Sequence, residues 1–257
     1  MLQTFTKRRD KKKLLLGVLL LFLGLVGIAS ILTMDLPLPA EAEAVLKENF
    51  TNWQIQLLLL INPGLMLLVG VTAGTLLYQE TRLSLPILER IVGFKSKPDL
   101  KGITVYGIAG GLLSGVLITM ISWGFSPFLP EEFQELSRSI QPGVAVRLLY
   151  GGITEEILMR FGLMTFVVWL SYKILKNRGS QIYWTGILVA ALIFAIAHFP
   201  IAYQAVEQPS LALLSYILLG NTLGGIIFGW LYWKKGLEAA FIGHMMAHLV
   251  MLFLETT

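Results

Sequence analysis

The sequence predicts an all-α polytopic membrane protein, a single bundle of about seven, or at most eight, transmembrane helices. Of its 257 residues, 55% are hydrophobic and 14% are charged, and the mean hydropathy is +0.72. Apolar runs of about 20 residues, the length that crosses a bilayer core, recur along the chain. No polar insertion is long enough to form a second, soluble domain, so one bundle is the economical interpretation.

Hydropathy along the chain gives seven candidate spans. They cover residues 14–34, 56–78, 103–125, 143–172, 182–204, 211–233 and 237–254. The first run is longer than the roughly 7–15 residues of a signal-peptide core, which predicts an uncleaved anchor.

The basic residues test this count independently, because cytoplasmic loops of membrane proteins are enriched in Lys and Arg. Sixteen of the twenty basic residues fall before the first span or in the second, fourth and sixth loops. These are Lys7, Arg8, Arg9, Lys11, Lys12, Lys13, Arg82, Arg90, Lys95, Lys97, Lys101, Lys173, Lys176, Arg178, Lys234 and Lys235. We therefore expect an odd number of spans in a bacterial plasma membrane, with the N-terminus in the cytoplasm and the C-terminus on the opposite side.

Composition also excludes some classes of function. The chain has no cysteine, so disulfides, thiolate nucleophiles and cysteine metal ligands are ruled out. The net charge of +4 follows from the loop asymmetry and predicts contact with anionic lipid headgroups. No basic-aromatic motif indicates a nucleic-acid partner.

The fourth span carries two acidic residues and two arginines inside an apolar run. Glu156 and Arg160 are four residues apart and share one face of an α-helix, where each can neutralise the other. Glu155 is turned about 100° away in an α-helix, which leaves it free to face a cavity as a general base. The alternative is a structural ion-pair cluster that also includes Arg147 and only locks helices together.

All three histidines of the chain lie in apolar stretches. His198 shares a helix face with Phe194, and Pro200 is expected to loosen the helix beside it. A lone histidine of this kind is more often a packed core residue than a ligand. His244 and His248 are four residues apart, a spacing that suits two ligands of one metal or two donors to one oxyanion.

The sixth span adds small residues and one amide. Gly220, Gly224, Gly225 and Gly229 form small-xxx-small pairs that allow close helix packing. Asn221 is either a polar wall of a cavity, where it would contact substrate, or an interhelical hydrogen bond, which is the commoner use of Asn in spans.

The order EExxxR, FxxxH and HxxxH, on the fourth, fifth and seventh spans, resembles the CPBP family of intramembrane metalloproteases, which includes CaaX prenyl endopeptidases and Abi-type bacterial proteins. The resemblance covers roughly residues 143–254 and includes the stretch 229–236 (GWLYWKKG). It implies that residues 143–254 form the catalytic helical core. Residues 1–142 would then form the N-terminal anchor and the first three transmembrane helices of the same bundle.

The resemblance also implies roles for single residues. Glu155 would activate water with help from His198, His244 would stabilise the oxyanion or bind a metal, and Arg160 would hold Glu156 in place. The third motif usually ends in Asn or Asp, whereas this chain has His248, whose neutral ring can also donate a hydrogen bond.

The expected activity is hydrolysis of a peptide bond near the membrane, on a prenylated C-terminus or a leader peptide. The possible metal ligands are Glu155, His198, His244 and His248, and the sequence leaves open a divalent metal such as zinc or no metal. A non-catalytic bacteriocin-immunity or scaffold protein and an ion-coupled transporter are the alternatives.

The depth of the site cannot be assigned from the sequence. With the α-helical rise, His244 lies about 14 Å from Lys235, and Glu155 lies about 27 Å from Lys173. These depths do not match, so the membrane face that opens to the site stays unassigned.

Overall fold

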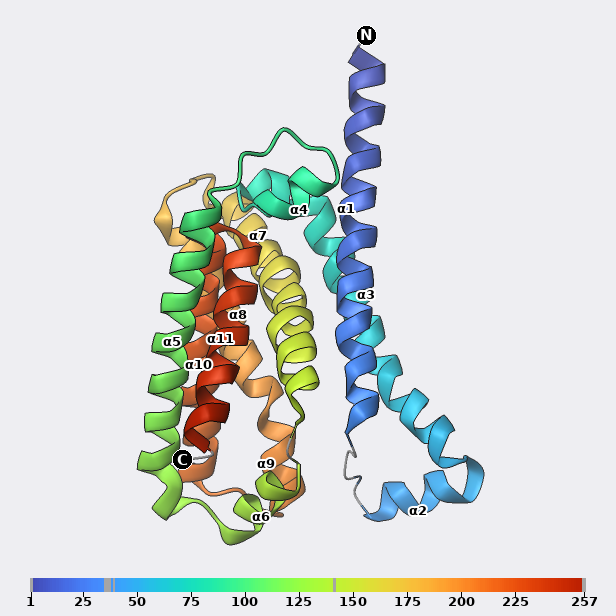
Figure 1. Ribbon diagram of the computed structural model, residues 1–257, viewed down its shortest axis with the longest axis vertical. Coiled ribbons are helices and arrows are strands. Elements are labelled where there is room, and N and C mark those ends of the chain that lie inside the picture. Colours follow the sequence, from blue (N-terminus) through green and yellow to red (C-terminus); the bar gives the residue numbers. More distant parts are fainter. Residues whose placement is uncertain (1, 35–37, 39, 141, 256–257) are drawn as a thin grey trace.

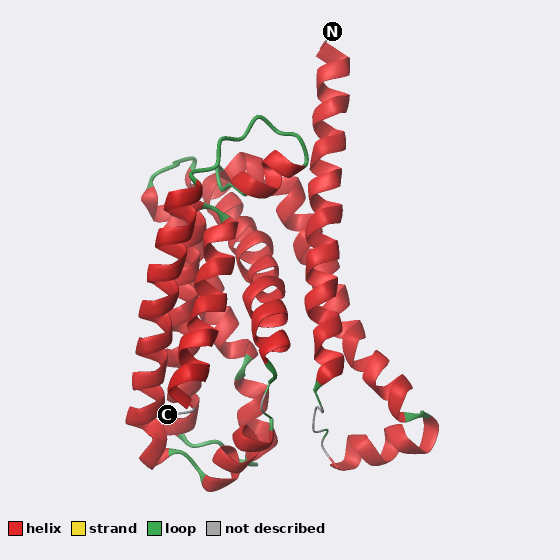
Figure 2. Cartoon of the chain, viewed as in Figure 1, coloured by secondary structure: helices red, strands yellow, loops and turns green. Residues whose placement is uncertain are grey.

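The computed structural model describes residues 2–34, 38, 40–140 and 142–255, and this part of the chain contains helices and no strand (Figure 2). The helices are α1 (Leu2–Ser30), η1 (Ile31–Thr33), α2 (Ala40–Asn49), α3 (Asn52–Thr81), α4 (Pro86–Ile91), α5 (Leu100–Phe125), η2 (Ser126–Phe128), α6 (Glu131–Ser139), η3 (Val146–Glu155), η4 (Ile157–Met164), α7 (Thr165–Leu175), α8 (Ser180–Ala197), α9 (Phe199–Ala205), α10 (Leu211–Lys235) and α11 (Leu237–Glu255).

The prediction of an all-α membrane bundle is confirmed. In the described part of the chain, seven helices are long and apolar enough to cross a membrane. They cover Arg9–Thr33, Asn52–Thr81, Leu100–Phe128, Val146–Leu175, Ser180–Ala205, Leu211–Lys235 and Leu237–Leu254. Each coincides with one predicted span, and the boundaries differ by a few residues because polar turns at both ends continue the helices.

Local sequence signals start and stop these helices. The Thr51 hydroxyl and the Gln54 side chain form a capping box at the start of α3, and Asp99 caps α5 by accepting from the backbone N–H of Gly102 at 2.9 Å. Helix α10 ends at Gly236, whose φ of 101° is readily available only to glycine. Helix α11 begins directly after it.

The bundle has two chemically different ends (Figure 1). The N-terminus, α4 and the 176–179 loop lie at one end, which we call the basic end, and α2, α6, α9 and the C-terminus lie at the other, the opposite end. Contacts between basic residues and distant segments support this grouping. Lys12 donates to the carbonyl of Gly93, and Lys173 pairs with Glu80 at 2.9 Å.

The fourth span is not a regular α-helix. Segments η3 and η4 are π-helical, with backbone hydrogen bonds from i to i+5, and only α7 continues the span as an α-helix. The hydroxyls of Thr154 and Thr165 donate to the carbonyls five residues earlier, at 3.4 and 3.2 Å. The α-helical geometry assumed for Glu155 and Glu156 is therefore wrong, because a wider turn changes both the angle and the rise per residue.

Glycines of α10 let this helix approach α8. A Cβ added to Gly225 would lie 2.7 Å from the Cβ of Ala191, and one added to Gly229 would lie 3.1 Å from Ile187. At Gly220 the same added atom would meet nothing within 4 Å. Close packing against α8 thus explains Gly225 and Gly229 of the predicted small-xxx-small pairs. Gly220 makes no such contact and leaves open space beside the helix.

Candidate active site

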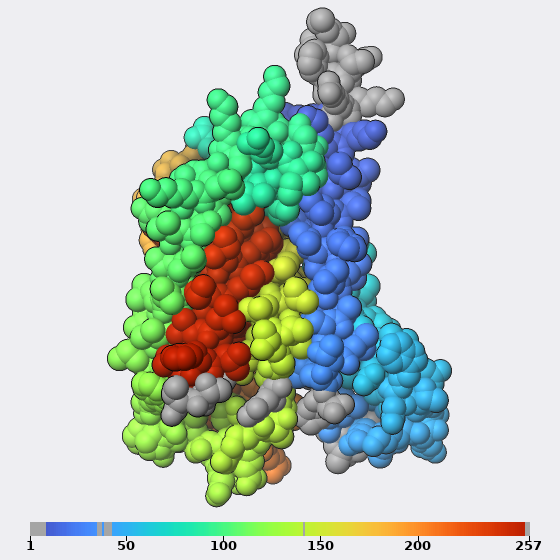
Figure 3. All heavy atoms as spheres, in the orientation of Figure 1, coloured from blue at the N-terminus to red at the C-terminus, as the bar shows by residue number. Residues whose placement is uncertain are grey.

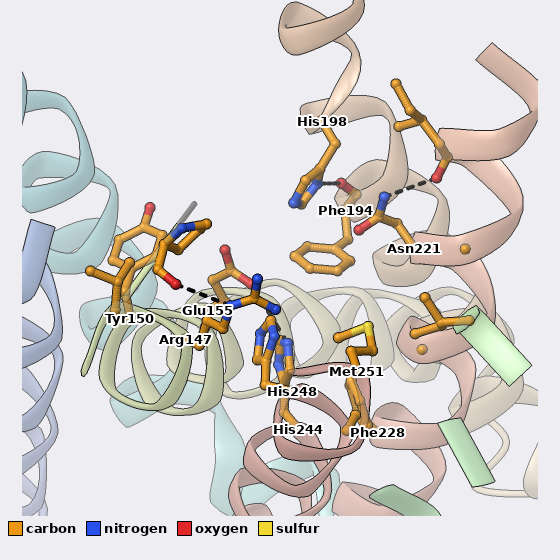
Figure 4. Close-up of a pocket in the computed structure, with 18 of the residues that line it drawn as sticks. Arg147, Tyr150, Glu155, Phe194, His198, Asn221, Phe228, His244, His248 and Met251 are labelled. Atoms are coloured by element: carbon orange, nitrogen blue, oxygen red, sulfur yellow. Dashed lines mark hydrogen bonds and ion pairs between the residues drawn. The ribbon is translucent and has the colours of Figure 1, made fainter. Parts of the chain in front are cut away.

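A cavity of 340 Å³ lies inside the helix bundle (Figure 4). Its walls come from η3, α8, α10 and α11, with Ile118 of α5 added. Six of the eight predicted site residues line it. They are Glu155, Phe194, His198, Asn221, His244 and His248. The other two, Glu156 and Arg160, are buried directly behind it, with exposures of 0% and 1%.

Glu156 connects two different spans. One carboxylate oxygen faces Arg160 Nε at 3.1 Å, as the sequence predicts, and the other accepts from His244 Nδ1 at 2.8 Å. The guanidinium of Arg160 also lies 5.3 Å from the ring centre of Phe194 and donates to the carbonyl of Gly225 at 3.4 Å. Glu156 therefore fixes both its own helix and the ring orientation of His244.

Glu155 is the carboxylate that faces the cavity. Its side chain is 18% exposed, whereas that of Glu156 is fully buried. The distance from its Oε2 to His244 Nε2 is 3.9 Å, which is too long for a direct hydrogen bond. The prediction that Glu155 and the histidines share one pocket agrees with this arrangement.

His198 occupies the junction between α8 and α9, where Pro200 in the first turn of α9 prevents a continuous helix. Its Nδ1 lies 2.8 Å from the carbonyl oxygen of Phe194. Because a carbonyl can only accept, Nδ1 carries the hydrogen, and in the neutral ring Nε2 is an acceptor. His198 thus offers a lone pair to the cavity.

His244 is held between two rings. Phe228 stacks on one face at a centroid distance of 4.6 Å, and His248 stacks on the other at 4.8 Å. The Nδ1 atom of His248 is buried and has no hydrogen-bond partner among the described residues. His248 therefore supports the position of His244 by ring contact, a role that the HxxxH spacing does not reveal.

Phe194 and Asn221 both line the cavity, as predicted for substrate-binding residues, yet their contacts are mostly structural. The ring of Phe194 is 7% exposed and packs edge-on against His198 at 4.7 Å. The amide of Asn221 donates to the carbonyl of Ile217 in its own helix at 2.9 Å. This bond is intrahelical, so the expectation of an interhelical hydrogen bond is wrong.

Two features of this site are not predictable from the sequence. The role of Phe228 is one, because one more phenylalanine in an apolar span carries no distinguishing signal. The bond between Glu156 and His244 joins residues 88 positions apart, and it depends on the register between two helices, which spacing along the chain cannot give.

The predicted metal ligands do not form a metal site as they are arranged. Within the described ranges, no three His, Asp or Glu side chains gather closely enough to hold a metal ion. Two of the four ring nitrogens of His198 and His244 are already engaged by Phe194 and Glu156.

A family model matches the part of the chain that carries this site. Residues 139–250 match the family model of the Rce1-like type II CAAX prenyl endopeptidases, and this range includes every predicted site residue. Searches of curated proteins and of solved structures gave no significant match. Together with the three motifs and their convergence around one cavity, the match confirms the resemblance to the CPBP proteases. Residues 139–250 of this chain are thus similar to the Rce1-like type II CAAX prenyl endopeptidases.

Proposed function

We propose that this chain is a membrane-embedded endopeptidase that hydrolyses a peptide bond with water activated by Glu155. The observation that carries the proposal is the convergence of one partly exposed carboxylate and three imidazoles on one cavity within the membrane-spanning bundle. Ionisable groups at this depth are costly, so a chain keeps them there mainly for function.

The first step follows from the hydrogen-bonding capacity of Glu155 and His198. Both present acceptors to the cavity, so a water molecule between them can donate one hydrogen to each. As the water oxygen adds to the carbonyl carbon of the peptide bond, one water proton passes to the Glu155 carboxylate. Collapse of the tetrahedral intermediate breaks the C–N bond, and Glu155 returns this proton to the leaving amine.

The oxyanion of the intermediate needs a hydrogen-bond donor. The Nδ1 hydrogen of His244 is engaged by Glu156, so the Nε2 atom of His244 donates only when the ring is doubly protonated. A carboxylate on Nδ1 stabilises such an imidazolium and fixes its orientation. In this proposal Glu156 and Arg160 are positioning residues, and His244 is the donor to the oxyanion when its ring is doubly protonated.

The change from glutamate to glutamine at position 155 tests this proposal. Glu155→Gln keeps the shape of the side chain but removes the proton acceptor, so cleavage is lost while folding is kept. The measurement compares the peptide termini in membrane fractions from cells that express either form at equal levels. Glu132→Gln on exposed α6 is the matched control, since it makes the same chemical change outside the cavity.

The outcome separates three classes of protein. A peptidase gives termini that are present with the wild-type and Glu132→Gln forms and absent with Glu155→Gln. A scaffold or immunity protein keeps its phenotype in all three forms and changes no termini. A transporter changes solute flux without changing termini, and either of these last two results would overturn the proposal.

A further inference from the structure

The cavity has a defined position along the membrane normal. At about 1.5 Å per residue, Tyr216 lies about 8 Å from the start of α10 at the opposite end and about 28 Å from Lys235 at the basic end. His198 and Ile118 each lie about 27 Å from the basic ends of their helices, Ser180 and Leu100. Three helices thus place this part of the cavity wall nearer the opposite end.

The deepest residues of the cavity lie closest to the basic end. His244 is about 10 Å from Leu237, and Phe228 is about 10 Å from Lys235. Their exposures are only 5% and 2%, whereas Glu155, His198 and Asn221, nearer the opposite end, are partly exposed.

A packed layer of side chains borders the cavity on the side of the basic end. Arg160, Leu231 and Tyr232 have exposures of at most 1%. The hydroxyls of Tyr232 and Thr165 are hydrogen-bonded at 3.0 Å within this layer. Among the described residues, this buried layer lies between the cavity and the basic end.

The opposite end, in contrast, supplies part of the cavity rim. Pro142, in the segment between α6 and η3, lines the cavity, and its carbonyl accepts from Arg147 Nε at 3.1 Å. A second apolar cluster at this end includes Phe133 of α6, Ala202 of α9 and Ile217 of α10. Ile217 belongs both to this cluster and to the cavity wall, so α6 and α9 pack next to the cavity at this end.

The alternation of basic residues indicates that the basic end is cytoplasmic. We propose that the site is reached from the non-cytoplasmic face and that its substrate is a translocated peptide segment of a membrane-anchored protein, with apolar side chains around the cleaved bond. This inference rests on the proposed function for its substrate, and on the fold and the pattern of basic residues for its direction of access. The apolar walls fit such a segment, because Ile118, Val146, Ile217, Ala247 and Met251 surround the few polar groups.

The absence of cysteine from the chain makes direct labelling possible. Single cysteines are introduced into the full chain at Met251 and Ile118 in the cavity, at Lys97 beyond the basic end and at Arg138 on α6. Intact cells are treated with a membrane-impermeant sulfonated maleimide, which reacts only with thiols in contact with water. Size-exclusion profiles in detergent identify any variant that fails to fold. If one of the two cavity variants fails to fold, the other still tests the inference.

We expect the Met251→Cys, Ile118→Cys and Arg138→Cys variants to react in intact cells, and the Lys97→Cys variant to react only after permeabilisation. Reaction of both cavity cysteines only after permeabilisation, or reaction of neither, would overturn the inference. Reaction of the Lys97→Cys variant in intact cells would overturn it as well, because the basic end would then face outward.

The positions of the cleaved bonds separate this inference from the proposed function. If the cavity labels from outside but no termini depend on Glu155, the proposed function fails and the direction of access stands. If termini depend on Glu155 but lie in cytoplasmic segments, the proposed function stands and this inference fails.

Discussion

Removal of one partner from the buried Glu156–Arg160 pair is the sharpest test of how the site is held. The two side chains are 0% and 1% exposed and lie 3.1 Å apart. Arg160→Met keeps the length and the apolar contacts of the stem but leaves the carboxylate buried with only His244 Nδ1 as a partner. Breaking such a pair costs about 3–5 kcal/mol of folding free energy.

This cost corresponds to a fall in Tm of about 6–20 °C for a chain of this size. The assay is thermal unfolding in detergent, followed by the fluorescence of the six tryptophans. The double variant Glu156→Gln with Arg160→Met removes both charges and should recover at least about 1 kcal/mol relative to the sum of the single changes. Arg138→Met on exposed α6 is the control and should leave Tm within about 2 °C, since surface changes usually cost little.

A Tm of Arg160→Met within about 2 °C of the wild-type Tm would contradict this prediction. The variant would then not show the expected loss of about 3–5 kcal/mol of folding free energy. It would also be refuted if the double variant were no more stable than the two single changes predict together, because the charges would then not be coupled.

Further predictions concern packing and ring contacts. Gly225→Ala should destabilise the chain by about 1–3 kcal/mol in the same thermal assay, because its Cβ would lie 2.7 Å from that of Ala191. Gly220→Ala, where nothing lies within 4 Å, should keep or raise Tm, so equal losses at both positions would contradict the packing account. Phe228→Leu should cost about 1–3 kcal/mol, since it removes the ring stacked on His244 and placed 5.5 Å from the guanidinium of Arg160. His248→Asn should keep cleavage in the terminus-mapping assay. It should lose about 0.5–1.5 kcal/mol of folding free energy, because only the ring stacked on His244 is removed. Loss of cleavage would show that His248 has a chemical role.

The spans were predictable because they depend on local composition. About 20 apolar residues between polar turns specify a crossing helix in any context, and the alternation of basic residues fixed the count. The pairing of Glu156 with Arg160 was also predicted, since residues four apart remain close in both an α-helix and a slightly wider one.

What could not be predicted depends on contacts between distant helices. The side chains of Glu155 and His244 lie 3.9 Å apart, although their depths counted along their own helices at the α-helical rise differ. The π-helical turns of η3 and η4 hold more residues per turn, so the fourth span rises less per residue than the α-helical count assumes. No residue pattern in this span distinguishes a π-helix from an α-helix.

The division into residues 1–142 and 143–254 stays a prediction. Helix α5, from the first part, packs along α10 and α11 of the second, and a Cβ added to its Gly107 would lie 2.8 Å from Ile242. In the space-filling view, α11 lies between α5 and η3 on the visible face (Figure 3). The first part therefore contributes to the packing around the cavity.

The most direct test of the central claim follows the oxygen atom of water. Membranes from cells that express Glu155→Gln, in which uncleaved substrate accumulates, are mixed in ¹⁸O-labelled water with purified wild-type or Glu155→Gln chain. The account predicts new peptide C-termini that carry ¹⁸O with the wild-type chain and none with the Glu155→Gln chain. Labelled termini at equal rates with both chains, or with neither, would contradict hydrolysis by water that Glu155 activates.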